Sequence, residues 1–327
     1  MTDIEVLADG VRRGDRRSLA RAITLVESQR PDQRVLAIEL LDALLPATGA
    51  GIRVGISGPP GVGKSTLIEA LGIHVVREGH RVAVLAIDPS STRSGGSILG
   101  DKTRMELLAR ETDAYIRPSP SSGVLGGVAR RTREAMVVCE AAGFDVVVIE
   151  TVGVGQSEVD VDDMVDTFVL LVAAGGGDEL QGIKRGVTEM ADIVAVTKAD
   201  GELLVAAQRA ASDHRNALHL LRPRTSGWSP PVLLCSASTD SGINELWATV
   251  GAHRAALEVA GALEERRAAQ ARRWLWAEVR DSMLRELLAD PEAAHAADEL
   301  EREVVSGALS PTSAAQRLLE VHGRPSR

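Results

Sequence analysis

The chain has 327 residues and a net charge of −9 at neutral pH, which argues against nucleic acid or an anionic membrane as its main partner. Hydrophobic residues make up 44% of the chain but aromatic residues only 2%, so we expect a core of Val, Leu, Ile and Ala, as in a parallel sheet covered by helices. Its two cysteines, Cys139 and Cys235, lie in apolar runs and are expected to be buried, and without a signal-peptide pattern or an apolar run of about 18 residues the chain is expected to be cytoplasmic.

The N-terminal part of the chain is predicted to be helical. Residues 3–46 alternate polar and apolar side chains at helical spacing, and Pro31 and Asp32 mark a break between two helices. Residues 46–51 (PATGAG) then form a short linker.

From residue 52 the pattern changes to short apolar strands, most of them separated by helical segments. The predicted strands are residues 53–57, 82–87, 146–150, 167–172, 193–197 and 232–235. Strands that are apolar on both faces and alternate with helices predict an α/β fold with a mainly parallel sheet covered by helices.

No strand pattern remains after Trp247. Residues 254–290 and 292–321 are predicted helices with breaks at Pro291 and Pro311, and the Ala-, Glu- and Arg-rich stretch from 254 suits an exposed or intersubunit helix. The predicted organisation is therefore an N-terminal helical extension at 1–50, a central α/β domain at 51–253 and a C-terminal helical arm at 254–327.

A phosphate-binding loop follows the first predicted strand. The run GPPGVGKST matches the P-loop pattern G-x-x-x-x-G-K-[ST], with a strand before it and a helix after it, which disfavours a chance glycine loop. Lys64 would reach the β- and γ-phosphates, and the Ser65 hydroxyl would ligate Mg²⁺. The predicted nucleotide-binding residues here are Gly58, Pro59, Pro60, Gly61, Val62, Gly63, Lys64, Ser65 and Thr66.

A guanine-reading motif, TKAD, follows the strand at 193–197. Asp200 can accept hydrogen bonds from both N1–H and the 2-amino group of guanine, whereas adenine would leave the carboxylate unpaired at a cost of about 1.5–3 kcal/mol. The Lys198 stem would pack over the base. Thr197 replaces the commoner Asn and leaves nucleotide selectivity slightly open. After the next strand, Ser236, Ala237 and Ser238 resemble the S-A-x element whose backbone contacts guanine O6.

A third motif ends the strand at 146–150. Glu150 stands where GTPases carry the Asp of D-x-x-G, and Gly153 could meet the γ-phosphate. No glutamine follows this glycine directly, and Gln156 is three residues further on. This spacing predicts slow intrinsic hydrolysis that depends on a partner. A buried structural acid is the alternative for Glu150.

Two polar loops are candidates for nucleotide-sensing segments. Residues 87–104 follow the second strand, where GTPases place a switch, and contain Asp88 and Asp101 as candidate Mg²⁺ or γ-phosphate sensors. Residues 175–186 combine glycines at both ends with a polar centre, which predicts a mobile segment. A solvated loop and a plain connection are the respective alternatives.

Four longer runs carry a family resemblance that covers nearly the whole chain. AIDPSSTRSGGSILGDKTRM, RPSPSSGVLGGVARRTREAM, AAGFDVVVIETVGVGQSE and GDELQGIKRG strongly resemble the MeaB/ArgK family of P-loop GTPases, whose human counterpart is the methylmalonic aciduria type A protein. The resemblance implies a SIMIBI-class, metallochaperone-type GTPase that binds GTP or GDP with Mg²⁺ and forms a homodimer through its C-terminal arm. Its implied partner is adenosylcobalamin-dependent methylmalonyl-CoA mutase. The resemblance implies that the GTPase gates loading of the mutase's cofactor and protects the mutase, and that the mutase accelerates GTP hydrolysis.

The resemblance also implies residue roles. The loop 175–186 is similar to the family's third switch, with Gln181 and Lys184 as the residues that relay nucleotide state to the mutase. The predicted catalytic residues are Lys64, Asp101, Glu150, Gln181 and Lys184, and the predicted metal ligands are Ser65, Asp88, Asp101 and Glu150.

Two other functions are compatible with a P-loop. An ATP-using kinase or ATPase of the lysine/arginine/ornithine transport type is disfavoured by Lys198 and Asp200, because ATP gains nothing from a guanine-reading carboxylate. A nickel-insertion GTPase would need Cys or His clusters, and the chain has no C-x-x-C and no dense His tract. His214 and His219 fit no metal-ligand spacing and are expected to be surface residues.

Overall fold

The computed structural model describes residues 2–88, 105–120, 125–151, 157–174, 185–221 and 223–322. It divides into two compact units, residues 1–270 and 271–327. The division lies inside a long helix, and the predicted boundaries after residues 50 and 253 stay predictions.

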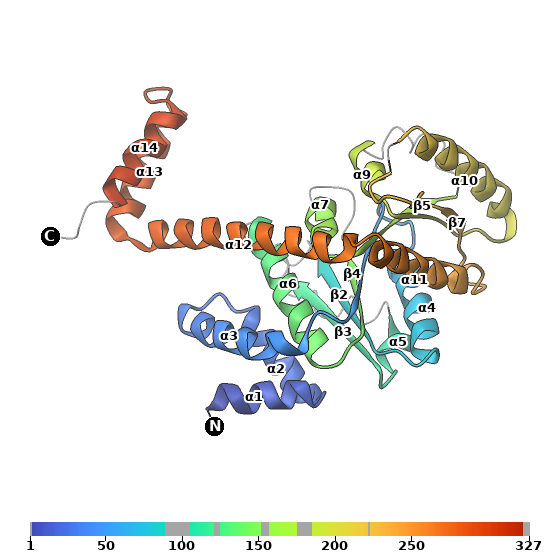
Figure 1. Cartoon of the computed structure of the whole chain (residues 1–327). Coiled ribbons are helices and arrows are strands. Elements are labelled where there is room, and N and C mark those ends of the chain that lie inside the picture. Colours follow the sequence, from blue (N-terminus) through green and yellow to red (C-terminus); the bar gives the residue numbers. More distant parts are fainter. Residues whose placement is uncertain are drawn as a thin grey trace. The chain divides into compact units, whose positions relative to one another are not determined.

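A seven-stranded parallel sheet forms the centre of the first unit, as predicted (Figure 1). Its strand order is β3-β2-β4-β1-β5-β6-β7, and each adjacent pair is parallel. The strands are β1 (Ile52–Ser57), β2 (Val82–Asp88), β3 (Ala114–Pro120), β4 (Val146–Glu150), β5 (Thr167–Ala173), β6 (Ile193–Thr197) and β7 (Val232–Leu234). All strands run in the same direction, so their carboxyl ends lie on the same side of the sheet. The carboxyl ends of β1, β4 and β6 precede or carry the sequence motifs.

Strand β3 is absent from the sequence-based prediction. It pairs only with β2 and forms one edge of the sheet, from Val82 opposite Ala114 to Asp88 opposite Pro120. Pro118 and Pro120 lie within it. Proline lacks the backbone N–H that a strand donates to its neighbour, so it is tolerated mainly in an edge strand. The two prolines therefore argue against a strand in the sequence, although the edge position of β3 allows them.

The N-terminal segment contains three helices rather than the two predicted. They are α1 (Asp3–Arg12), α2 (Arg16–Val26) and α3 (Pro31–Leu44). Gly14 has a φ of 73°, and the Asp15 carboxylate accepts a hydrogen bond from the Ser18 N–H at the start of α2. A left-handed glycine followed by an N-cap ends one helix and begins the next.

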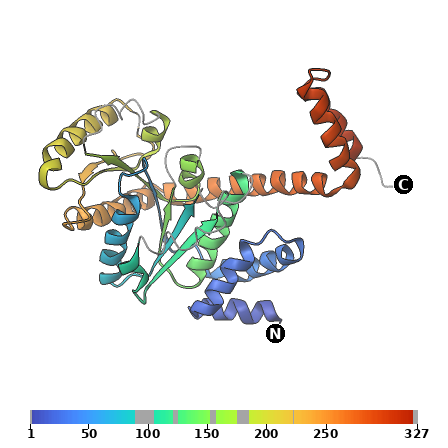
Figure 2. The same ribbon diagram turned by 180° about the vertical axis from the view of Figure 1, so that it is seen from behind.

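The remaining helices cover the sheet and form the second unit (Figure 2). They are α4 (Lys64–Arg77), α5 (Glu106–Ala109), α6 (Leu125–Ala141), α7 (Ser157–Asp162), α9 (Arg185–Met190), α10 (Leu204–His219), α11 (Ile243–Val259), α12 (Ala262–Ala289), α13 (Pro291–Val305) and α14 (Pro311–His322). The predicted continuous helix 254–290 is interrupted by Gly261, which has a φ of 66°. Pro291 and Pro311 occupy first helical positions, where their missing N–H costs nothing. None of the described helices is long and apolar enough to cross a membrane.

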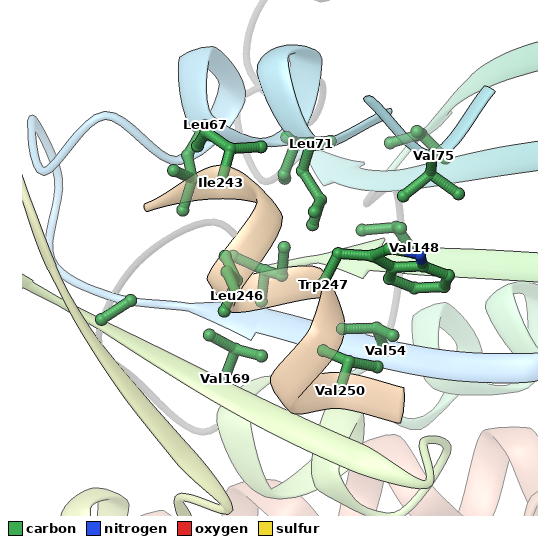
Figure 3. Packing of buried hydrophobic residues seen from close by; sticks show 14 of the residues in the cluster. Val54, Leu67, Leu71, Val75, Val148, Val169, Ile243, Leu246, Trp247 and Val250 are labelled. Carbon is green, nitrogen blue, oxygen red and sulfur yellow. The ribbon is translucent and has the colours of Figure 1, made fainter. Parts of the chain in front are cut away.

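The core on one face of the sheet is aliphatic, as the composition predicts. Helices α4 and α11 pack there against β1, β4 and β5 (Figure 3). The side chains that meet are Leu67, Leu71 and Val75 of α4, Ile243, Leu246, Trp247 and Val250 of α11, and Val54, Val148 and Val169 of the strands. Helix α4 is thereby fixed on the strand that precedes it. Both cysteines are buried, as expected, and burial raises the pKa of Cys235 to about 12.

Among the described residues, the histidines His214 and His253 are buried, which corrects the expectation that His214 is a surface residue. His214 in α10 and His253 in α11 are 4% and 0% exposed. Burial lowers the pKa of His214 while the neighbouring Asp213 opposes the change, and burial likewise lowers the pKa of His253 against the effect of Asp192. Both imidazoles therefore favour the neutral form in the folded chain.

The pH dependence of stability should report His214. Its folded-state pKa is lowered, so below about pH 6.5 the unfolded chain binds a proton that the folded chain does not, and stability falls with acidification. We expect His214→Leu to lose less stability than the wild type between pH 7.5 and 5.5, by at most about 1.4 kcal/mol per pH unit. Urea denaturation at several pH values measures this. The exposed His219, replaced by Gln, is the control, and parallel curves for wild type and His214→Leu would contradict the prediction.

Candidate functional site

The loop between β1 and α4 has the conformation of an anion-binding turn. A Cβ on Gly58 would lie 2.6 Å from the Leu171 carbonyl oxygen, so only glycine fits there. Gly63 caps α4 with a φ of 95°, and no side chain caps this helix. The first N–H groups of α4 are therefore available to an anion at the helix N-terminus.

The Lys64 side chain lies over this loop. Its Nζ donates hydrogen bonds to the carbonyl oxygens of Gly58 at 2.8 Å and Pro59 at 3.2 Å. Burial lowers the pKa of Lys64, and the carboxylates of Glu150 and Glu158 oppose that effect. A buried cation at a helix N-terminus suits phosphate binding.

Ser65 and Glu150 supply adjacent oxygens beside the loop. The Ser65 hydroxyl in the first turn of α4 donates to Glu150 Oε1 at 3.0 Å, and Glu150 is the last residue of β4. Hydroxyl and carboxylate oxygens are ligands that Mg²⁺ prefers, so this pair fits the predicted metal. Asp88 is the last residue of β2, two residues after Ala86, which pairs with Glu150. Asp88 and Glu150 therefore both lie at the carboxyl ends of their strands.

Thr197 joins the phosphate loop to the predicted guanine motif. Its hydroxyl donates to the carbonyl oxygens of Val62 at 2.6 Å and of Val172 at 3.3 Å. Lys198 adopts a φ of 55° and donates from Nζ to the Gly61 carbonyl at 2.8 Å. The threonine that departs from the common motif therefore still holds the two loops together.

Asp200 is oriented by the two serines of the S-A-x element. Both hydroxyls, of Ser236 and Ser238, donate to Asp200 Oδ2, the second at 2.8 Å. These hydrogen bonds, that of Ser236 first, lower the pKa of Asp200 and favour the charged carboxylate. Sequence reasoning assigned this element a backbone role only. The side-chain role was missed because nothing in a three-residue pattern shows which carboxylate it faces.

A cavity of about 370 Å³ lies along α4, between this helix and the start of α11. Of the predicted site residues, its lining contains Thr66 and Ala237 but none of Lys64, Glu150 and Asp200. A larger hollow of about 580 Å³ lies among α1, α2 and α3 and contains no residue of the predicted site. Neither hollow contains Lys64 or Asp200, so the nucleotide site is located by the contacts among the motif residues.

Glu158 is a residue near the phosphate loop that sequence reasoning did not single out. It lies in the first turn of α7 and is fully buried. Its negative charge acts on Lys64 although the two residues are far apart in the chain. The run GQSE contains it, but no spacing rule pairs it with the loop.

Several predicted residues lie outside the described part of the chain. They are Asp101, Gly153, Gln156, Gln181 and Lys184. Their roles stay predictions. Among the described residues, no group of three or more His, Cys, Asp or Glu side chains is arranged to hold a metal ion.

Comparison with known proteins identifies the family. The family model described as methylmalonyl Co-A mutase-associated GTPase MeaB matches residues 19–292. The chain belongs to the MeaB family. A probable GTPase of Mycobacterium tuberculosis is 58% identical over 318 residues, covering 97% of this chain and 95% of that protein.

Two further relatives extend the comparison of this MeaB-family chain. The mouse mitochondrial methylmalonic aciduria type A homolog is 49% identical over 330 residues, covering 97% of this chain and 79% of the relative. A solved structure described as LAO/AO transport system kinase is 38% identical with a TM-score of 0.77, covering 98% of each chain. The chain is therefore a P-loop GTPase that binds a guanine nucleotide.

Replacing the guanine-reading carboxylate should weaken nucleotide binding. In Asp200→Asn the side chain loses an acceptor for the base, so we expect the affinity for GDP to fall about 10–100-fold, which corresponds to about 1.5–3 kcal/mol. Xanthosine diphosphate has a carbonyl in place of the 2-amino group. We expect Asp200→Asn to lose much less affinity for it than for GDP, because the Asn amide can donate a hydrogen bond to that carbonyl. Calorimetric titration measures both, with the exposed Glu202→Gln as the control. Unchanged GDP affinity would refute the assignment.

Proposed function

We propose that this MeaB-family GTPase is a chaperone of adenosylcobalamin-dependent methylmalonyl-CoA mutase, which gates loading of the cofactor and protects the mutase. The observation that carries the proposal is the match over residues 19–292 to a family described as mutase-associated. The name of the mouse relative refers to methylmalonic aciduria, which agrees with it. The joined phosphate and guanine motifs supply the nucleotide site that such a role requires.

The nucleotide site would act through residues that already face one another. Lys64 would exchange the carbonyls of Gly58 and Pro59 for the β- and γ-phosphates, which are stronger acceptors for an ammonium group. Ser65 and Glu150 would hold Mg²⁺, which neutralises phosphate charge when bound. Asp88 and Asp101 are the further proposed metal ligands.

Hydrolysis would be slow without the partner. In the sequence, Val154 and not a glutamine follows Gly153, so the attacking water would need positioning groups from elsewhere. We propose Asp101, Gln181 and Lys184 for this purpose and for transmission to the mutase. Lys184 would then matter for stimulated hydrolysis more than for nucleotide binding.

The second unit would form the dimer contact. On α12, Trp276 and Met283 are each 63% exposed, and Leu284 and Leu288 add to the same broad side. Apolar side chains at this spacing on a long helix favour burial against another helix. We propose that the occupant is a second copy of this chain, because a two-fold pairing covers the same face on both copies.

The chaperone proposal predicts mutase-stimulated GTP hydrolysis. We expect slow turnover by the purified protein, clearly faster turnover with the mutase, and little inhibition by excess ATP. Lys64→Ala should lower turnover by about 100-fold or more because nucleotide binding is lost. Lys184→Ala should retain GDP affinity but lose the stimulation. Phosphate release measures turnover, and equal loss of affinity in both variants would argue against a relay through Lys184.

The description of the solved relative as a transport system kinase favours a second candidate function. This alternative is an ATP-using kinase or ATPase of the lysine/arginine/ornithine transport type. Efficient ATP turnover that the mutase does not change would select it. The Asp200 carboxylate, held by two serine hydroxyls, favours GTP instead.

The dimer proposal predicts that one charge on α12 separates the copies. Met283→Glu places a carboxylate on the exposed apolar side and should shift the protein from dimer to monomer at micromolar concentration, because an unpaired charge in an apolar contact is costly. Analytical ultracentrifugation measures the mass. Arg285→Gln, which changes a polar and exposed position of the same helix, should remain dimeric. A wild-type monomer at high concentration would refute the proposal.

A further inference from the structure

The predicted guanine-reading carboxylate belongs to a triangle of three side-chain oxygens. Asp200 Oδ2 accepts a hydrogen bond from the Ser236 hydroxyl and, at 2.8 Å, from the Ser238 hydroxyl. The two serine oxygens lie 2.9 Å apart. All three pairs of oxygens are therefore within hydrogen-bond distance, but the two hydroxyls supply only one proton each. One of the three possible hydrogen bonds is always unmade.

Backbone contacts fix this triangle in place. The Ser236 N–H donates to the Ser241 carbonyl at 2.8 Å, which closes the turn between the two serines. On the other side, the Ala199 N–H donates to the Cys235 carbonyl at 3.1 Å. Because Ala199 directly precedes the carboxylate residue, the guanine motif and the S-A-x element are held together by their main chains. The serine hydroxyls therefore meet the carboxylate without depending on a flexible loop.

The two serines differ in how their hydroxyls are held. Ser236 is fully buried, and its hydroxyl oxygen accepts from the Thr239 N–H at 3.3 Å, so its proton is directed to Asp200. Ser238 is exposed, and its hydroxyl can donate either to Asp200 Oδ2 or to Ser236 Oγ. A hydroxyl oxygen has two lone pairs, so Ser236 can accept from both Thr239 and Ser238. The Ser238 hydroxyl is therefore the donor that can turn from one partner to the other.

Guanine and hypoxanthine make different demands on such a carboxylate. Each carboxylate oxygen has about two lone-pair sites, and the two hydroxyls take both sites of Asp200 Oδ2. Guanine brings two donors, N1–H and the 2-amino group, so one of them has to replace the Ser238 hydroxyl. Hypoxanthine, the base of inosine nucleotides, has N1–H but no amino group, so its single donor can bind Oδ1 while Ser238 stays in place. The missing amino group then leaves no acceptor unpaired, and an unpaired acceptor is the usual reason that a polar site rejects such an analogue.

From this arrangement we propose that Ser238 competes with the base for Asp200 Oδ2, so that the site accepts inosine nucleotides beside guanine nucleotides. With guanine, the Ser238 proton turns to Ser236 Oγ, and every donor keeps an acceptor. With hypoxanthine, Ser238 makes the hydrogen bond that the absent amino group does not make. The proposal rests on the guanine-reading role of Asp200, which the GDP affinity of Asp200→Asn tests separately, and it does not require the chaperone role.

The ratio of GDP affinity to inosine diphosphate (IDP) affinity in the whole protein tests the competition. One hydrogen bond to a charged group commonly contributes about 10–100-fold in affinity, and we expect the wild type to prefer GDP by less than about tenfold. Ser238→Ala removes the competing donor, so the ratio should rise by about threefold or more. Calorimetric titration in the presence of Mg²⁺ measures both affinities, and circular dichroism shows whether the variant is folded.

Two further variants separate competition from a general effect on the turn. Ser238→Thr keeps the hydroxyl and should keep the wild-type ratio. Thr239→Ala removes a neighbouring hydroxyl but keeps the N–H that Ser236 accepts, so it should leave the ratio unchanged as well. If Ser238→Ala does not fold, Ser238→Cys takes its place, because a thiol is a weak donor.

Two results would overturn the proposal. A ratio that the loss of the Ser238 hydroxyl leaves unchanged or lowers would mean that this serine only orients the carboxylate. A wild type that prefers GDP over IDP by about tenfold or more would mean that the hydroxyl does not replace the amino group.

Discussion

The parallel direction of all seven strands is the constraint on which the rest of this structure depends. It places the carboxyl ends of β1, β4 and β6 on one side of the sheet, with Glu150 and Thr197 as the last residues of β4 and β6 and Lys64 in the segment after β1. The beginnings of β5 and β6 lie on the other side. The nucleotide-binding groups therefore lie at one end of the strands, and the start of α12, where Arg266 and Arg267 bind Asp192 and Asp166, lies at the other end.

The charged residues at the carboxyl ends of the strands differ in their pairing from those at the amino ends. At the carboxyl ends of the strands, Lys64, Glu150 and Glu158 are all buried, and the two carboxylates raise the pKa of Lys64 against the effect of burial. At the amino ends of the strands, Asp166 and Asp192 each form an ion pair with an arginine and also accept a hydrogen bond from a backbone N–H. Buried pairs add little net stability, because desolvation offsets their attraction. Their value here is positional, since each pairing specifies where α12 begins.

Much of the fold and the site follows from local sequence. Six of the seven strands are short, mainly apolar runs whose bounds the sequence predicts to within one residue at each end. Strand β3 was missed because Pro118 and Pro120 are acceptable only at an edge, and the edge position of a strand is decided by its neighbours. The break at Gly14 was missed because the apolar spacing continues across it.

The sequence by itself determined the phosphate loop, the guanine motif and the family, because these depend on short runs of backbone conformation and fixed spacing. Only the tertiary structure decided that Ser236 and Ser238 hold Asp200, that Thr197 binds the Val62 carbonyl, and that Glu158 acts on Lys64. The partners in these contacts lie in different elements, from 36 residues apart in the case of Asp200 to 135 in the case of Thr197. The pairing of such residues depends on strand order and helix packing, which local spacing does not encode.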